Sequence, residues 1–179
     1  MLSLSGSYFG LFLHSERAFP EKVSARELEM QQNLPIIFIR IAVGLVFLTE
    51  GALKFLLPNE LGAGRFAAIG LPFPNMLAPL VGCAELAGGA AILLNLYAGD
   101  AALMLLVVIA TALVTTKFPI LFGRPLGPFA LMNAPHTGLM GFLHESRTDL
   151  SMLFALVAIL IDSGLHLGRR RPWYQSKGL

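Results

Sequence analysis

Four long runs of apolar residues dominate the chain, and shorter segments rich in polar residues, glycine or proline separate them. The runs cover residues 35–57, 76–97, 101–122 and 150–167. At about 1.5 Å per residue, the first three can cross a hydrocarbon layer of about 30 Å, and the fourth is close to the minimum length. The runs lack the strict alternation of membrane β-strands, and backbone polar groups in lipid must be satisfied within each segment. The pattern therefore predicts an all-α membrane protein, a four-transmembrane-helix bundle.

The connections between the runs differ in kind. Residues 58–75 are rich in glycine and proline and predict an ordered loop or a short interfacial helix. Ala98 to Asp100 predict a tight turn with Asp100 as the N-cap, so that the second and third spans form an antiparallel hairpin. Residues 123–149 contain prolines and histidines among apolar residues and predict a segment that lies on or dips into the membrane interface.

The chain divides into three parts on this reading. Residues 1–34 form an extramembrane segment, in which Ser24-Ala-Arg-Glu27 is a capping box that predicts a short N-terminal surface helix ending near Asn33. Residues 35–168 form the transmembrane domain, and residues 169–179 form a basic tail.

Positive charges predict the orientation of the spans. Lysine and arginine are more frequent at the two ends of the chain and around the second connection than on the other side, and Arg169 to Arg171 precede Trp173 and Tyr174. Basic and aromatic residues of this kind anchor helix ends at the cytoplasmic headgroups. We therefore expect both termini on the cytoplasmic side.

Composition agrees with a membrane location and narrows the function. Apolar residues make up 55% of the chain and charged residues 13%, and the mean hydropathy is +0.70. A net charge of +2 without a basic stripe argues against a nucleic-acid partner. Cys83 is the only cysteine, which excludes an intrachain disulfide, a CxxC pair and a thiolate zinc site. The histidines lack metal-ligand spacing, so we expect no metal and no covalently bound cofactor.

Three motifs lie in order along the apolar runs. The first run has Arg, Gly, Phe, Gly and Lys at spacings of four, three, four and three: Arg40, Gly44, Phe47, Gly51 and Lys54. The second run places Glu85 among Gly82, Gly88 and Gly89, and Glu145-Ser-Arg147-Thr-Asp149 precedes the fourth. Together these motifs resemble the DoxX family of small four-helix bacterial inner-membrane proteins. The resemblance covers most of residues 35–168, departs at Glu50, where the family often has histidine, and does not extend before Pro35.

Helical spacing explains why the glycines recur. Steps of three and four place the motif of the first run on one face, because they follow the 3.6-residue turn. Gly44 and Gly51 on this face let a neighbouring helix approach closely. Gly82, Gly88 and Gly89 form a comparable face on the second run, so we expect these five glycines to pack helices together.

Ionisable residues inside the spans are the candidate chemistry. Their predicted depths let Glu50, Lys54 and Glu85 share one polar cluster that handles protons. One alternative is that Glu50 and Lys54 form an i to i+4 ion pair that only makes the helix tolerable in lipid. Glu85 is either protonated or paired with Lys54, and a buried carboxyl suits a proton acceptor beside a quinol as well as a silent hydrogen-bond donor.

Other charged residues are expected at the two ends of the bundle. Lys117, Glu145 and Arg147 could line the mouth of the cluster. Arg40 and Asp162 lie at matching depth near the opposite end, and we predict that they form an ion pair.

The resemblance implies a function that the residues alone do not. Some DoxX relatives are subunits of thiosulfate:quinone and terminal quinol oxidase systems. The resemblance therefore implies a membrane subunit associated with quinone-linked electron transfer. It also implies quinone as the candidate ligand, and lipid and other membrane subunits as partners. Without a redox domain, the chain is not expected to be an autonomous enzyme. The alternative is a non-catalytic structural or accessory subunit of a respiratory or photosynthetic complex. A transporter would need oligomerisation.

Overall fold

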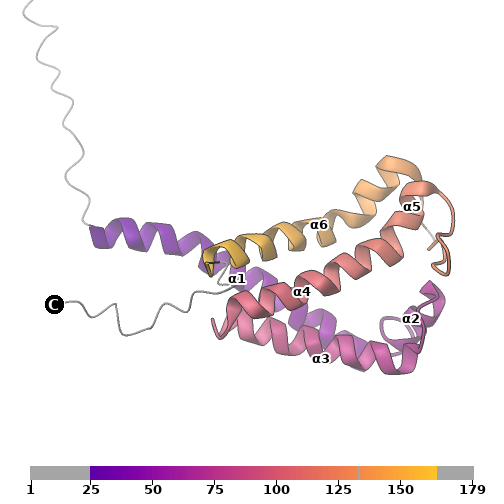
Figure 1. Ribbon diagram of the computed structural model, residues 1–179, viewed down its shortest axis with the longest axis horizontal. Helices are drawn as coiled ribbons and strands as arrows, with labels where there is room; N and C mark the ends of the chain where they lie inside the picture. The colour runs from indigo at the N-terminus through magenta and orange to yellow at the C-terminus, as the bar shows by residue number, and fades with distance from the viewer. Residues whose placement is uncertain (1–24, 133, 165–179) are drawn as a thin grey trace, which may run out of the picture. The chain divides into compact units, whose positions relative to one another are not determined.

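The computed structural model describes residues 25–132 and 134–164. Within them the secondary structure is helical, and the one β feature is an isolated bridge between Leu126 and Phe129. The predicted all-α class is confirmed. The helices are α1 (Ala25–Leu56), α2 (Ala63–Ile69), α3 (Pro74–Leu93), α4 (Ala98–Ala112), the π-helical turn η1 (Leu113–Lys117), α5 (Phe118–Phe122) and α6 (Gly138–Asp162), as Figure 1 shows.

Three helical stretches of the described chain are long and apolar enough to cross a membrane. They are Leu34–Leu56 of α1, Pro74–Leu93 of α3, and Ala98–Phe122, in which η1 and α5 continue α4. Each lies within a few residues of a predicted span. α6 is not among them, because charged residues occupy its first half and the predicted end of the fourth run, Leu167, lies outside the described residues. A fourth span stays a prediction.

The chain separates into two compact units, residues 1–34 and residues 35–179. Of the first unit, residues 25–34 are described, and they are helical. α1 continues through Pro35 without a break, so the short helix that was expected to end near Asn33 is not a separate element. Ser24 of the capping box, the basic tail and Arg169 to Arg171 lie outside the described residues.

α3 and α4 form the predicted antiparallel hairpin and lie side by side (Figure 1). The turn between them differs from the prediction. Asn95 and Tyr97 adopt positive φ angles, and α4 begins at Ala98, so Asp100 lies in the first turn of the helix and is not its N-cap. There its negative charge still faces the positive end of the helix dipole.

α6 packs along α4, and it begins within the segment that was predicted to lie at the membrane interface, before the predicted fourth run. Residues 123–132 and 134–137 are mostly irregular, but the helix begins at Gly138 instead of near Leu150. The last proline of this region is Pro135, and the residues of α6 include no proline that would interrupt it. Phe118 of α5 and Phe142 of α6 are tilted rings whose centroids lie 6.0 Å apart, which extends the contact toward the helix start.

The core of the second unit is apolar and draws on all the long helices. Fully or almost fully buried side chains come from α1, α3, α4 and α6: Val43, Phe47, Ile92, Leu105, Leu156 and Ile159. In lipid such contacts stabilise through close packing, because the surrounding acyl chains are as apolar as the side chains.

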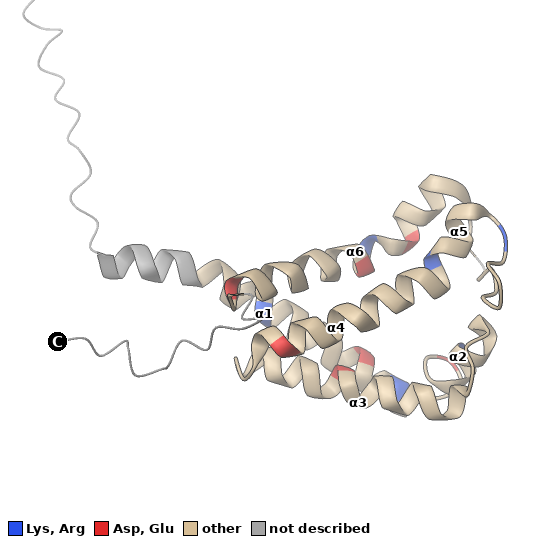
Figure 2. Cartoon of the chain, in the orientation of Figure 1, with Lys and Arg blue, Asp and Glu red and all other residues tan. Residues whose placement is uncertain are grey.

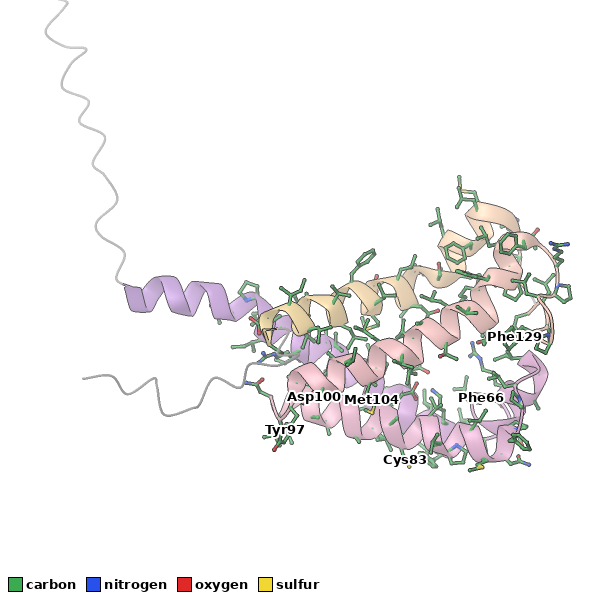
Figure 3. The ribbon with its side chains drawn as sticks, viewed as in Figure 1. Phe66, Cys83, Tyr97, Asp100, Met104 and Phe129 are labelled. Atoms are coloured by element: carbon green, nitrogen blue, oxygen red, sulfur yellow. The ribbon has the colours of Figure 1, made fainter. Side chains whose placement is uncertain are left out.

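One end of the bundle is closed by α2 and the segment after α5. Residues 58–75 do contain the short helix that was one of the two predicted alternatives. Ala130 N–H donates to the Ile69 carbonyl at 2.9 Å, which ties the segment to α2. Gly70 has a φ of +92° and faces the Pro128 carbonyl so closely that a Cβ there would collide with it. Phe66 and Phe129 lie at this end, and Tyr97 and Asp100 at the opposite one (Figure 3).

Candidate functional site

Close backbone contact between α1 and α3 is the foundation of the site. The pairs Gly44 with Gly89 and Gly51 with Gly82 face one another along the two antiparallel helices. A Cβ added at Gly51 would lie 2.8 Å from the Gly82 carbonyl oxygen, and one added at Gly89 would lie 2.9 Å from the Gly44 carbonyl oxygen. Gly88 instead faces Leu105 of α4. The structure thus places all five predicted packing glycines at helix contacts.

Lys54 and Glu85 meet across this glycine contact. The Lys54 ammonium lies 2.6 Å from Glu85 Oε2, and 10% of the lysine side chain and 6% of the glutamate side chain are exposed. Side chains on a helix tilt toward its N-terminus. Because α1 and α3 are antiparallel, the Lys54 side chain tilts toward the level of Glu85, and the Glu85 side chain tilts toward the level of Lys54. This tilt brings together two residues whose backbones lie at different depths.

Glu50 joins the pair from the outer side of α1. Its Oε2 lies 3.9 Å from the Lys54 ammonium, which also donates a 3.4 Å hydrogen bond to the Glu50 backbone carbonyl. The Glu50 side chain is 55% exposed, unlike its two neighbours. The structure therefore brings the three predicted residues together, with the predicted i to i+4 pair and the contact between Lys54 and Glu85 both present.

The three side chains form a row from the surface of a span to its interior. Charged residues are otherwise sparse along the long helices (Figure 2). Glu85 Oε2 has no aligned hydrogen-bond donor within the described part of the chain, so its contact with Lys54 is an ion pair with remaining acceptor capacity. The exposed carboxylate of such a row can accept a proton from a bound molecule. The buried carboxylate can stabilise the positive charge of the lysine beside it. Cys83, two residues before Glu85 on α3, points outward (Figure 3).

Lys117 occupies a different place from the row. It ends the π-helical turn η1, and its ammonium lies 3.6 Å from Asp149 of α6. Pro119 explains the wide turn, because proline has no N–H and its ring presses on the carbonyl four residues earlier, that of Thr115. π-helical turns inside α-helices are frequent at functional sites.

Of the three residues predicted to form a mouth, two share a cleft. Lys117 and Glu145 line a cleft of about 330 Å³ together with residues after α1 and on α2, whereas Arg147 does not line it and donates to the His144 carbonyl at 2.7 Å. Glu50, Lys54 and Glu85 do not line it either. The cleft is therefore a separate feature and not an opening of the row.

Arg40 and Asp162 form an ion pair toward the other end of the bundle, as their matching depth predicts. The Arg40 guanidinium donates to Asp162 Oδ2 at 2.7 Å. The arginine side chain is 15% exposed and the aspartate 38% exposed. The pair links α1 to α6, two helices far apart in the sequence.

Because Asp162 is partly exposed, we expect a modest contribution from this pair. Arg40→Gln and Asp162→Asn should each lower the unfolding free energy by about 1 kcal/mol, and a double-mutant cycle in mixed micelles should give a coupling of similar size. Additive single effects would show that the pair contributes nothing to stability.

Sequence reasoning missed several residues of the cleft and the partner of Lys117. Asp149 belongs to the motif that precedes the fourth run, and its position at the same end of the bundle as Lys117 is the signal in the sequence that points to the pair. Asn59, Glu60, Arg65 and Met132 come from connections whose path no helical period predicts. No group of three or more His, Cys, Asp or Glu that could hold a metal ion occurs among the residues that the structure describes.

Comparison with known proteins places the chain among its relatives. The DoxX family model matches residues 36–117. These residues include most of the first span and all of α3, with Glu85 and the glycines around it. The uncharacterized membrane protein Rv3486 of Mycobacterium tuberculosis is 42% identical over 125 residues, which cover 70% of this chain and 72% of that protein. No solved structure gives a significant match. The family match and this relative together show that the chain belongs to the DoxX family of membrane proteins.

Proposed function

We propose that this protein is a membrane subunit of a quinone-linked electron-transfer system, in which Glu50, Lys54 and Glu85 handle protons at a site open to lipid. The observation that carries the proposal is the gradient of exposure along the row, from 55% at Glu50 to 10% at Lys54 and 6% at Glu85. Ionisable residues inside membrane spans are expensive to bury and are functional candidates by default.

The row supplies the groups that a quinol needs. Oxidation of a quinol releases two protons with two electrons, and the electrons pass to a redox centre on a partner subunit in this proposal. Glu50 is exposed on a span, so a lipid-dissolved molecule can reach its carboxylate as a proton acceptor. The Lys54 ammonium donates a hydrogen bond to a quinone oxygen, and Glu85 positions the lysine through their 2.6 Å contact.

The proposal includes a topology. We place α6 as the fourth span, because Leu156 and Ile159 are buried against α4 and the residues from Leu150 onward are mostly apolar. Both termini then lie on one side, and the distribution of lysine and arginine in the sequence favours the cytoplasmic side of a bacterial inner membrane.

The Glu85→Gln variant tests the chemistry. It keeps the shape of the side chain and removes the charge, so we expect the quinone-dependent rate to fall about 100-fold in membranes that contain the complex. The rate would be measured as reduction or oxidation of a short-chain benzoquinone. Asp100→Asn, a carboxylate at the other end of the bundle, is the matched control and should leave the rate unchanged. A Glu85→Gln rate equal to that of the wild type would remove the glutamate from the mechanism.

A second candidate function is that of a non-catalytic accessory subunit. The exposure of Glu50 on a span favours it as well, because a carboxylate facing lipid is costly and a neighbouring subunit would cover it. Native purification in mild detergent separates the two. Constant association with one large complex, together with quinone turnover that is indifferent to both Glu50→Gln and Glu85→Gln, would favour the accessory role.

A further inference from the structure

The cleft at the end of the bundle has no part in the proposed proton chemistry. It has a volume of about 330 Å³, at the lower end of the range for ligand pockets. Its walls come from the segment after α1, from α2, from η1 and α5, and from α6. The lining residues are Asn59, Glu60, Gly64, Arg65, Ala68, Thr116, Lys117, Ile120, Met132 and Glu145.

The depth of the cleft follows from the ends of the spans. The first span ends at Leu56, and Asn59 and Glu60 lie three and four residues after it. Another span ends at Phe122, and Lys117 and Ile120 lie within its last two turns. Ends of membrane-spanning helices lie at the membrane–water interface, so the cleft lies at the level of the lipid headgroups.

The charges that line the cleft are balanced in number. Arg65 and Lys117 are cations, and Glu60 and Glu145 are anions. A simple anion or a simple cation would meet repulsion from half of this set. A molecule that carries both charges can place each one against residues of opposite sign.

The inner wall of the cleft holds its shape through contacts within the protein. Lys117 is fixed by the ion pair with Asp149, and the buried Thr116 hydroxyl donates to the Ala112 carbonyl at 2.6 Å. Ile120 in the lining is buried, and Met132 is half-buried. The lining therefore combines a charged part with an apolar part, as an amphipathic ligand requires.

From these observations we propose that the cleft binds the headgroup of a phospholipid that carries a phosphate and a primary ammonium, namely an ethanolamine phospholipid. Arg65 and Lys117 contact the phosphate, and Glu60 and Glu145 accept hydrogen bonds from the ammonium. The apolar wall contacts the glycerol and the first acyl carbons. A primary ammonium has N–H donors for the two carboxylates, whereas a trimethylammonium has none.

Native mass spectrometry of the full chain tests the proposal. Dioleoyl lipids with ethanolamine, choline and glycerol headgroups would be titrated onto the detergent-purified protein. We expect the ethanolamine lipid to bind at least tenfold more tightly than either of the others, because they lose the charged hydrogen bonds to both carboxylates and the loss of one such bond is worth about tenfold. Equal binding of the three lipids would overturn the proposal.

Variants assign the preference to the cleft. Glu145→Gln should reduce the preference for ethanolamine over choline, because Glu60 is then the one remaining carboxylate acceptor of the pair, and Arg65→Gln should weaken binding of both lipids by a similar factor. The controls are Arg147→Gln, which removes a charge from the same helix outside the cleft, and Asp100→Asn at the opposite end, and both should bind as the wild type does. An unchanged preference in Glu145→Gln, or unchanged binding in Arg65→Gln, would place the lipid elsewhere. Displacement of the lipid by equimolar glycerophosphoethanolamine would assign the cleft to a soluble zwitterion and overturn the lipid assignment.

Discussion

Replacement of Gly51 by leucine is expected to lower the unfolding free energy by about 3 kcal/mol, at the upper end of the usual range for overpacking. A Cβ at this position would already lie 2.8 Å from the Gly82 carbonyl oxygen and 3.0 Å from the Leu86 backbone nitrogen. Both atoms belong to the backbone of α3, so no side-chain rotation relieves the contact. α1 and α3 must therefore move apart, which also separates Lys54 from Glu85. Unfolding in mixed micelles, followed by circular dichroism, would measure the loss.

Ala42→Leu is the matched control for this prediction. Ala42 is exposed on α1, so the same added side chain faces the surroundings and should change the unfolding free energy by less than about 0.5 kcal/mol. If Gly51→Leu were as stable as Ala42→Leu, the close contact between α1 and α3 would not exist in the membrane protein.

Replacement of Lys54 by methionine is expected to lower the unfolding free energy by about 3 to 5 kcal/mol. The change keeps most of the apolar volume and leaves Glu85, whose side chain is 6% exposed, without its 2.6 Å partner. Removal of one member of a buried ion pair leaves an uncompensated charge, which is the costly part of the substitution. The same unfolding experiment in mixed micelles measures the effect.

The double variant Lys54→Met with Glu85→Leu should regain most of the lost stability, because it leaves no buried charge. Glu50→Gln is the control within the same row. Its side chain is 55% exposed, so its loss should change the unfolding free energy by less than about 1 kcal/mol. A double variant less stable than Lys54→Met would contradict this expectation. It would show that Glu85 stabilises the contact between the helices even without its charged partner.

Periodic features of the fold were predictable from the sequence, and irregular ones were not. The length of the apolar runs predicted the spans in α1, α3 and α4 to within a few residues, because a helix in lipid must satisfy its own backbone. The start of α6 was missed because its first half is amphiphilic and has no continuous apolar run. The turn at Asn95 and Tyr97 was misplaced because neither residue is a glycine, although both adopt positive φ.

The candidate site likewise has parts that the periodicity of the sequence predicts and parts that it does not. Spacing predicted the shared face of the glycines and the meeting of Glu50, Lys54 and Glu85, since depth in a span follows directly from residue number. The pairing of Lys117 with Asp149 depends on a π-helical turn that shifts the phase of the helix, which a regular period does not predict. The cleft depends on loops folded by hydrogen bonds such as that from Ala130 to Ile69, which leave no periodic signal.

The paired glycines of α1 and α3 set how the two helices align, whereas other residues, at positions 50, 54 and 85, carry the ionisable groups. Each helix has two contact glycines, seven residues apart, and both pairs meet at the same offset along the helix axes. If one helix slid past the other by one turn, a glycine would face a bulky side chain. Substitutions at positions 50, 54 and 85 thus leave the offset unchanged. The mutual placement of the two helices therefore rests on residues without side chains, and the ionisable groups between them are not needed to set it.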